Sequence, residues 1–378
     1  MRFRVHGGIA TTAALWLLSA SLVGGQASQG ARPTMAEEVF KNIQVLKGIP
    51  VDQFMGTMGF FSAALGMNCT DCHVDESGGS WAKYADDNDL KRTARRMVQM
   101  VAGINRGNFG GRQVVTCNTC HRGSRRPNVM PSLALLYGSP PPDEPGEPIE
   151  QAAGQPAAEQ VLDRYIQAVG GPDRLAKLTS LVAKGTYKGF DDADKSPLEV
   201  FASAPGQRTT IVHTLNGDST TVVGSGGGWI AAPEAEKPVP LLAITGQELD
   251  GVRLEASLLF PGRIKEALST WRVGPAALVD DRETLVVQGT TAGGATVTLC
   301  FDAKTALLVR LVRFSESPVG RLVTRVDYDD YRDVAGVKIP FKWTVSWLSG
   351  RSLFELSNVQ PNVTIDAAKF ARPPAARR

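Results

Sequence analysis

The 378-residue sequence predicts a multidomain protein, with an all-α domain followed by an α+β domain built on one long, curved antiparallel sheet of the half-barrel kind. Three observations predict this fold class. Apolar residues recur at helical spacing from Met35 to Tyr137. Six prolines then lie within the 17 residues from 140 to 156, which excludes a helix or a central strand there. Short alternating strands, separated by turns rich in Gly, Asp and Pro, fill most of the remainder.

The composition is that of an ordinary globular protein, with 43% hydrophobic and 21% charged residues. A formal net charge of +3 is too balanced to predict nucleic acid as the main partner. The chain has only four His and five Cys. Four of the Cys and two of the His fall into two identical motifs, so these rare residues carry most of the information about chemistry.

The first 27 residues predict an export signal. Arg2 and Arg4 form a basic start, an apolar run extends from Ile9 to about Val23, and small residues precede a cleavage point after Ala27. We therefore expect a periplasmic protein, soluble or membrane-associated, with an uncleaved anchor as the alternative. The predicted organisation is a signal over 1–27, a helical domain over 28–137, a proline-rich linker over 138–156 and the sheet domain over 157–378.

Both motifs read C-x-x-C-H. The thiols are Cys69 and Cys72 in the first motif and Cys117 and Cys120 in the second, followed by His73 and His121 respectively. This spacing places two thiols one helical turn apart, where they can add to the vinyl groups of a haem while the adjacent His reaches the iron. The sequence therefore predicts two covalently bound c-type haems.

Other thiol chemistries are possible. A four-Cys zinc site is one alternative, but 44 residues separate Cys72 from Cys117, which is more than such sites usually have. Two disulfides or a thioredoxin-like redox pair would suit an oxidising compartment. Neither of these explains why a His follows the second Cys in both motifs.

Elimination favours Met as the second axial ligand of the irons. His6 leaves with the signal, and His213 lies beyond the linker, so the two irons cannot both have two His ligands. His/Met ligation is a common alternative and raises the reduction potential. The candidates besides the initiator are Met35, Met55, Met58, Met67, Met97, Met100 and Met130.

Helical periodicity selects two of these residues. A helix is expected over 52–65, where Met58 shares an apolar stripe with Phe54, Phe61 and Leu65 and Met55 lies off its centre. Gly56, Gly59 and Ala63 nearby would let a flat macrocycle approach the backbone. In the next helix, Leu90, Ala94, Met97, Val101 and Ile104 form the stripe, whereas Met100 shares a face with Thr93 and Arg96. Met58 and Met97 are therefore the preferred iron ligands, although a Met on an apolar face often only fills core space.

The segment from Glu37 to Pro131 resembles the cytochrome c subunit of photosynthetic reaction centres. The resemblance rests on "EEVFKNIQVLKGIPVDQFMGTMGFFSAALGMNCTDCH", "ARRMVQMVAGIN" and "VTCNTCHRG". It implies a helix that carries a Met before each attachment motif, and it places the ligands of the family on Met58 and Met97. This chain departs from the family in having two motifs rather than the usual four, and it lacks the lipid-anchoring Cys that is often present.

The second domain is expected to begin with a helix over Pro156–Leu178, ended by Gly170-Gly171, with a further helical stretch over 247–269. Strands are expected near 180–190, 196–204, 207–215, 219–231, 283–289, 294–302, 306–315, 319–328, 337–347 and 351–359. The order of elements, with "VDYDDYRDVAGVKIPFKWTV", resembles the lipoprotein-localisation carriers LolA and LolB and related lipoprotein-sorting domains. That resemblance implies a concave face that can hold a lipophilic ligand; a structural or docking role is the alternative.

Other candidates for chemistry in the second domain have ordinary interpretations. Gly224–Gly228 lacks the Lys-Ser/Thr of a phosphate loop and is expected to form a turn. His213 is expected to be a structural or surface residue, and Cys300 a buried inert thiol. The acidic cluster Asp327, Asp329, Asp330 and Asp333 could bind a cation or form a solvated turn.

Acidic and basic residues lie in separate stretches of the sequence around the two motifs. Six acidic residues and one Lys lie from 71 to 89, and nine Lys or Arg with no acidic residue lie from 90 to 126. The basic stretch could be a solvated surface whose Arg residues neutralise haem propionates. Alternatively, it is a docking face beside the second haem for an acidic redox partner.

The leading hypothesis is an exported dihaem electron-transfer protein, rather than an enzyme. A peroxidase-like dihaem oxidoreductase is the alternative, but it would need an open iron site with a distal acid/base, and the helical domain has no spare His. A carrier of lipophilic ligands with a redox module is a third hypothesis.

Overall fold

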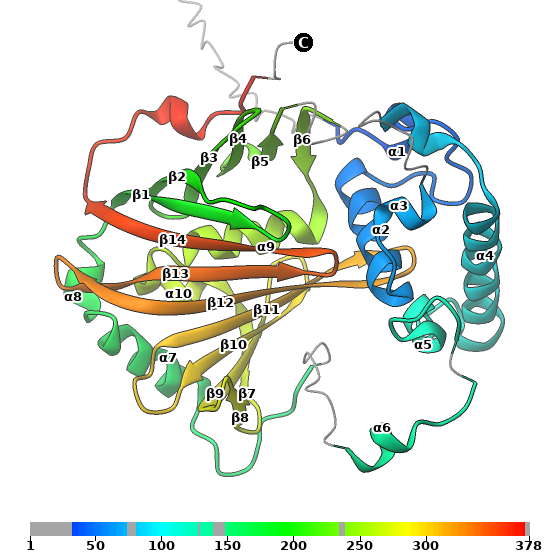
Figure 1. Ribbon diagram of the computed structural model, residues 1–378. Helices are drawn as coiled ribbons and strands as arrows, with labels where there is room; N and C mark the ends of the chain where they lie inside the picture. Colours follow the sequence, from blue (N-terminus) through cyan, green and yellow to red (C-terminus); the bar gives the residue numbers. More distant parts are fainter. Residues whose placement is uncertain (1–31, 74–80, 128, 139–147, 234–238, 375–378) are drawn as a thin grey trace, which may run out of the picture. The chain divides into compact units, whose positions relative to one another are not determined.

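The computed structural model describes residues 32–73, 81–127, 129–138, 148–233 and 239–374 (Figure 1). From Arg32 onward the chain forms one compact unit. The predicted export signal and residues 139–147 of the predicted linker lie outside the described residues. Within the described ranges, every helix is too short or too polar to cross a bilayer.

The described residues between 32 and 138, called the helical segment below, include two long helices. Helix α2 (Val51–Leu65) confirms the helix expected over 52–65, and it ends at Gly66 in the left-handed region at φ +61°. Helix α4 (Asp89–Phe109) begins where the Asn88 side chain accepts a hydrogen bond from the Lys91 amide. The shorter helices are α1 (Ala36–Val39), α3 (Cys69–Cys72), a 3₁₀ helix (Trp81–Ala85), α5 (Cys117–His121) and α6 (Leu133–Tyr137).

The second part of the chain folds into one 14-stranded sheet in which all paired neighbours are antiparallel. Its strands are β1 (Ser180–Gly189), β2 (Ser196–Ser203), β3 (Gln207–Thr214), β4 (Gly217–Gly224), β5 (Gly227–Ala231), β6 (Leu241–Ile244), β7 (Ser269–Val273), β8 (Ala277–Val279), β9 (Arg282–Thr290), β10 (Thr296–Asp302), β11 (Leu308–Ser317), β12 (Gly320–Val334), β13 (Val337–Trp347) and β14 (Gly350–Pro361). They follow the order β6-β5-β4-β3-β2-β1-β14-β13-β12-β11-β10-β9-β7, and β8 pairs with β9. The pairing of β1 with β14 therefore joins two runs of consecutive hairpins into one sheet.

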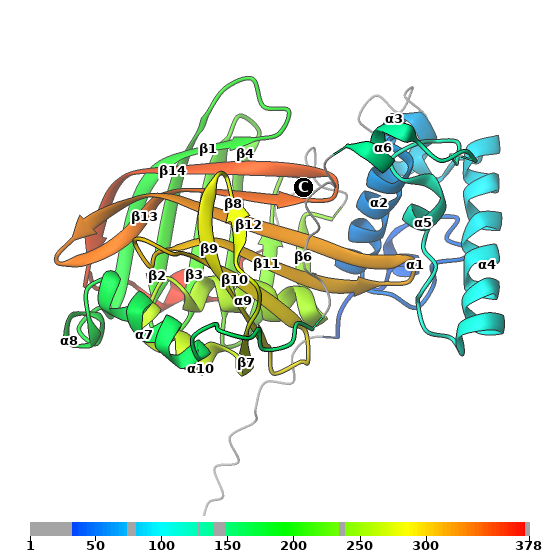
Figure 2. The same cartoon turned by 90° about the horizontal axis from the view of Figure 1, so that it is seen from below.

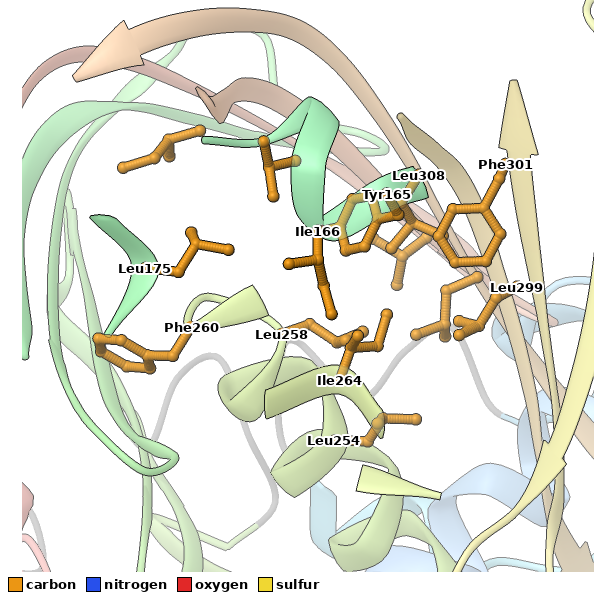
Figure 3. Close-up of a cluster of buried hydrophobic side chains, with 14 of the residues drawn as sticks. Tyr165, Ile166, Leu175, Leu254, Leu258, Phe260, Ile264, Leu299, Phe301 and Leu308 are labelled. Atoms are coloured by element: carbon orange, nitrogen blue, oxygen red, sulfur yellow. The ribbon is translucent and has the colours of Figure 1, made fainter. Parts of the chain in front are cut away.

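Helices of the same part of the chain cover one face of this curved sheet (Figures 1 and 2). They are α7 (Ala158–Ala168), α8 (Pro172–Leu175), α9 (Gly246–Ser257) and α10 (Ile264–Ala267), with 3₁₀ turns Pro261–Arg263 and Ala367–Phe370. Tyr165 and Ile166 from α7 pack with Leu254 of α9 and with Leu299 and Phe301 of β10 (Figure 3). The sheet and its own helices thus form a single large apolar core.

Several expected elements differ from the structure. The single strand expected over 219–231 is two strands, β4 and β5, because Ser225-Gly226 makes a two-residue turn between them. The first helix ends just before Gly170 and Gly171, as expected, and these two glycines at positive φ separate α7 from the short helix α8, which was not expected as a separate element. The helical stretch over 247–269 is likewise divided at Pro261. Short strands β6, β7 and β8 carry too few residues for alternation to reveal them.

Candidate haem-binding site

Each C-x-x-C-H motif forms one short turn of helix. Helix α3 carries Cys69 and Cys72, and α5 carries Cys117 and Cys120, so both pairs are three residues apart on one helical face. All four thiols are free rather than joined in disulfides. Burial raises the pKa of the Cys72 and Cys117 thiols, which keeps them protonated at neutral pH. The two thiols of each pair are therefore in the reduced form.

Both motif histidines are held by one ring nitrogen. His73 Nδ1 lies 2.9 Å from the carbonyl oxygen of Tyr84, and His121 Nδ1 lies 3.0 Å from that of Ser124. Because a carbonyl oxygen can only accept, each Nδ1 carries the hydrogen and each Nε2 keeps its lone pair. Burial also lowers the pKa of His73, which favours the neutral ring that binds a metal. Metal-ligating His residues in proteins usually donate their other ring N–H in this way, so the arrangement suits ligation through Nε2.

Helix α4 connects the two motifs through an Asn at each end. Asn88 Nδ2 donates to the Cys72 carbonyl at 2.8 Å. Asn105, which is buried, donates to the Val115 carbonyl at 2.8 Å and accepts from the amides of Val114 and Val115 at 3.1 and 2.9 Å. These two Asn are 17 residues apart, which corresponds to about 25 Å along a helix axis. One rigid helix therefore fixes the spacing between the two attachment motifs.

The structure places the two preferred Met residues on partly buried faces. Met58, on α2, is half-buried beside the cluster that contains Phe60, Ala64 and Cys117. Met97 is half-buried on α4, whereas Met100 is 46% exposed. Ligation of iron by Met58 and Met97 stays a prediction.

Gly56 and Gly59 have a different role from the one expected. A Cβ at Gly56 would lie 2.5 Å from Leu322 Cδ1, and one at Gly59 would lie 2.9 Å from Ser349 Oγ. These small residues let α2 pack closely against residues of the sheet rather than against a flat macrocycle. Residue spacing within α2 could not show which surface would approach these glycines.

The residues present fit two c-type haems. Each motif offers two free thiols and an imidazole whose Nε2 is available, and half-buried thioethers lie on the two long helices. Helix α4, all of whose 21 residues are described, buries only Asn105, so its apolar stripe is left half-buried. Within the described ranges, no three or more His, Cys, Asp or Glu come together to hold a metal ion, and the two Cys pairs therefore do not form one zinc site there.

Sequence reasoning missed three residues of the site. Tyr84 stacks on the His73 ring at 4.7 Å between centroids and supplies the carbonyl that holds this ring. Asn88 stands before an apolar helical run, which is an N-cap signal that could have identified it. Asn105 has no such signal, because its partners are backbone groups of a loop ten residues away.

The basic residues between 90 and 126 are mostly exposed. Lys91 and Arg95 are half-buried, with Lys91 donating to the Tyr84 carbonyl at 2.7 Å and Arg95 pairing with Asp87 at 2.7 Å. The exposed ones are Arg92, Arg96, Arg106, Arg112, Arg122, Arg125 and Arg126. Most of the basic charge between 90 and 126 is therefore accessible from solvent.

The remaining candidates in the sheet are engaged in local contacts. His213 Nδ1 lies 2.7 Å from Asp218 on the neighbouring strand β4. Cys300 is buried in β10 beside Val286 and Val309. Asp327 pairs with Arg310 and Arg325, at 2.5 and 3.0 Å. These contacts agree with structural roles rather than with a metal or redox site.

Comparison with known proteins supports the motif argument for the first part of the chain. Residues 19–136 match the family model described as the photosynthetic reaction centre cytochrome C subunit. The reaction center cytochrome c subunit of Thermochromatium tepidum is 38% identical over 105 residues, covering 27% of this chain and 24% of that protein. That of Roseobacter denitrificans is 29% identical over 145 residues, covering 35% of this chain and 38% of that protein. The chain thus spans well under half the length of these curated relatives.

The second part of the chain is similar to solved structures of a different kind. A LolA superfamily protein from Nitrosomonas europaea matches with a TM-score of 0.39 at 13% identity, over 57% of this chain and 98% of that chain. A putative outer membrane lipoprotein-sorting protein domain from Vibrio parahaemolyticus matches with a TM-score of 0.37 at 10% identity, over 56% and 97%.

Proposed function

We propose that the chain is an exported dihaem c-type cytochrome that transfers electrons between redox partners. Similarity of residues 19–136 to the reaction centre cytochrome subunit family indicates a cytochrome electron carrier. The main support for the proposal is the set of haem-binding side chains at the two motifs. Each has paired free thiols and an imidazole that a backbone carbonyl fixes with its Nε2 available.

The side chains of this site would hold and tune the cofactor. A bound haem supplies a one-electron Fe(III)/Fe(II) couple. Cys69 and Cys72 would hold one haem and Cys117 and Cys120 the other, with His73 and His121 as iron ligands. A thioether from Met58 and from Met97 would complete the iron coordination and favour a higher potential than a second imidazole would. The apolar stripes of α2 and α4 would exclude water from the macrocycles.

The number and positions of the His residues favour electron transfer over peroxidase chemistry. A peroxidase-like site needs an open iron position with an acid/base group beside it. Apart from the two motif residues, His213 is the one His after the signal, and it contacts Asp218 within the sheet. Carbon monoxide separates the two functions, because rapid binding to the native ferrous protein would support an open iron site.

The proposal is tested by intact mass and visible absorbance of the mature protein. We expect two haem additions, and one in each of the double variants Cys69→Ala/Cys72→Ala and Cys117→Ala/Cys120→Ala. Met58→Leu and Met97→Leu should each weaken the red absorption band of Met–iron ligation, whereas Met100→Leu, at an exposed position, should not. A colourless protein with the mass of the bare polypeptide, produced with competent maturation machinery, would refute the function.

The partner is proposed to be an acidic redox protein of a membrane complex on the periplasmic side. The seven exposed Arg between residues 90 and 126 would attract such a partner at low salt. We expect partner oxidation to slow steeply as ionic strength rises. A rate that does not change with salt would remove the docking role and leave these Arg as solvated surface or as neighbours of haem propionates.

Binding of a lipophilic ligand is the second candidate function, and a pocket on the sheet favours it. The pocket is lined by apolar side chains that include Val200, Ala202 and Trp343, with Arg208 and Glu255 among them. Arg208 Nε is buried and has no hydrogen-bond partner among the described residues. An amphiphile with an acceptor at its polar end would fit this combination. Native mass spectrometry for co-purified lipid, with Arg208→Ala as the comparison, tests it; a ligand-free wild-type protein from membrane-containing extracts would contradict it.

A further inference from the structure

A hairpin of the sheet enters the apolar cluster of the helical segment. The turn between β11 and β12 carries Val319, which is only 3% exposed. Val319 packs in one cluster with four buried residues of the helical segment, namely Leu46, Phe60, Ala64 and Cys117. Half-buried Met58 packs against the same cluster. The hairpin therefore contributes a side chain at the place where α2 and the second attachment motif meet.

The contact between the hairpins and α2 is close-packed. A Cβ at Gly320 would lie 2.3 Å from ring atoms of Phe60. On α2, a Cβ at Gly56 would approach Leu322, and one at Gly59 would approach Ser349 in the turn after β13. Helix α2 accordingly lies between the sheet and α4 (Figures 1 and 2). The absence of side chains at these glycines is what lets the two surfaces meet.

Polar contacts fix the register of this interface. Gln53 Nε2 donates to the Glu316 carbonyl at 2.8 Å, and Gln113 Nε2 donates to the Ser317 carbonyl at 3.0 Å. Gln53 lies on α2, whereas Gln113 lies four residues before Cys117. The hairpin is thus bonded both to the helix that carries Met58 and to the loop that leads into the second motif. It holds these two pieces of the helical segment relative to each other.

We propose that the β11–β12 hairpin is a positioning element of the haem site, with Val319 as its central positioning residue. This inference rests on the proposed haem function. The hairpin fixes α2 against α5, and it thereby fixes where the Met58 thioether stands. When the hairpin packs less tightly, α2 moves, sulfur ligation weakens and the reduction potential falls towards that of an iron without a Met ligand. The sheet is then part of the redox centre rather than an appended domain.

The experiment compares two buried Val→Ala substitutions in the full-length, haem-loaded protein. Val319→Ala removes the packing at the hairpin, whereas Val297→Ala makes the same truncation in the core of the sheet, where Val297 is 1% exposed. For each variant we measure haem count by intact mass, the red Met–iron band, the midpoint potential and Tm. We expect both variants to lose Tm, and Val319→Ala alone to lose red-band intensity and to shift its potential downwards.

Two further variants test the same contact. Gln113→Ala removes one hydrogen bond of the interface and should shift the band and potential in the same direction by less than Val319→Ala. Val319→Ile should preserve most of the red band, because it keeps an apolar branched side chain in the cluster. Unchanged band and potential in Val319→Ala and Gln113→Ala, with haem retained, would overturn the positioning role alone. A wild-type chain without haem would instead overturn the proposed function together with this inference.

Discussion

The helical segment and the sheet bury their apolar residues to very different extents. The core of the sheet joins 31 buried apolar side chains from its strands and covering helices. The largest cluster around the helical segment has five, and one of these, Val319, comes from the sheet. The apolar stripe of α4 stays half-buried along the whole helix. We therefore expect the sheet to fold on its own side chains, and the helical segment to depend on the proposed haems and on the hairpin to complete its core.

The largest structural effect is expected when haem attachment is prevented at both motifs. In a variant with Cys69, Cys72, Cys117 and Cys120 all changed to Ser, we expect α2 and α4 to lose most of their helical signal while the sheet stays folded. Far-UV circular dichroism and limited proteolysis would show cleavage concentrated in the helical segment. Cys300→Ala, which alters a thiol of the sheet, is the control. Full helicity in the four-Cys variant would mean that the helical segment is self-sufficient.

The sheet can be weakened separately through its buried ion pairs. Arg313 is 4% exposed and bonds to Glu255 at 2.8 Å and to Glu248 at 2.7 and 2.9 Å. Burial alone would raise the pKa of Glu248, but the Arg313 charge overcomes this effect and holds that pKa below its ordinary value. Arg313→Met removes the shared partner of two carboxylates, leaving Glu255 with only the longer contact of 3.6 Å to Arg208, and should lower the free energy of unfolding by about 3–5 kcal/mol.

Chemical denaturation monitored by Trp fluorescence measures this loss. Arg263→Ala is the matched control, because its pairing with Glu266 is exposed and should contribute less than about 1 kcal/mol. We expect the visible spectrum of the native Arg313→Met protein to stay unchanged. An equal effect of the two substitutions would contradict the importance of the buried cluster.

A smaller effect is expected from Asn105, which secures the loop before the second motif. Asn105→Ala leaves the Val115 carbonyl and two amides without their side-chain partner, which should cost about 1–3 kcal/mol of stability. Thermal unfolding followed at the haem absorbance is the measurement. Asn108→Ala, at an exposed position of the same helix, should change little. Equal losses in the two variants would indicate that only helix propensity matters.

A pH-dependent effect is expected where α2 meets the sheet. Asp52 accepts hydrogen bonds from the amide and hydroxyl of Thr245, at 2.6 and 2.9 Å, yet burial raises its pKa above the ordinary value. The folded state then holds the proton to a higher pH than the unfolded chain, so this contribution to stability is present in acid and is lost as pH rises through the folded pKa.

Asp52→Asn should therefore gain stability relative to the wild type as pH increases, by about 1 kcal/mol or less. Denaturant unfolding of both proteins at several pH values between about 3 and 7 measures the difference. A difference that moves in the opposite direction would show that the carboxylate, rather than the acid, is the favoured form at this interface.

A gain of stability of similarly small size is expected on α4. A Cβ at Gly107 would meet no atom within 4 Å, and the residue is exposed. Gly107→Ala should raise stability by about 0.5–1 kcal/mol, because Ala restricts the unfolded chain more than Gly does. Gly66→Ala is the contrasting change, because its Cβ would lie 2.2 Å from the Gly123 carbonyl oxygen at φ +61°. Thermal unfolding should therefore move in opposite directions for the two variants.

Much of the architecture could be predicted because it depends on residues close in sequence. The helix over 52–65 and most strands between 180 and 359 follow from periodicity that neighbouring residues set. The missed short strands and the division of 219–231 depend on pairing partners instead. The same distinction explains why the packing partners of Gly56 and Gly59 could not be predicted. Their spacing indicated a close approach, but only the folded chain showed that Leu322 and Ser349 make it.

The sequence by itself determined the two attachment motifs, the helical nature of the segment around them and the alternating strands that follow, because each depends on spacing within a few residues. The tertiary structure decided which backbone carbonyls hold His73 and His121, how α4 ties both motifs together, and that Val319 enters the helical cluster. Such features join groups that are far apart in the chain, as do Gln53 and Glu316, which are 263 residues apart and share a hydrogen bond. Only the balance of long-range packing against chain entropy can select such contacts, so no local pattern encodes them.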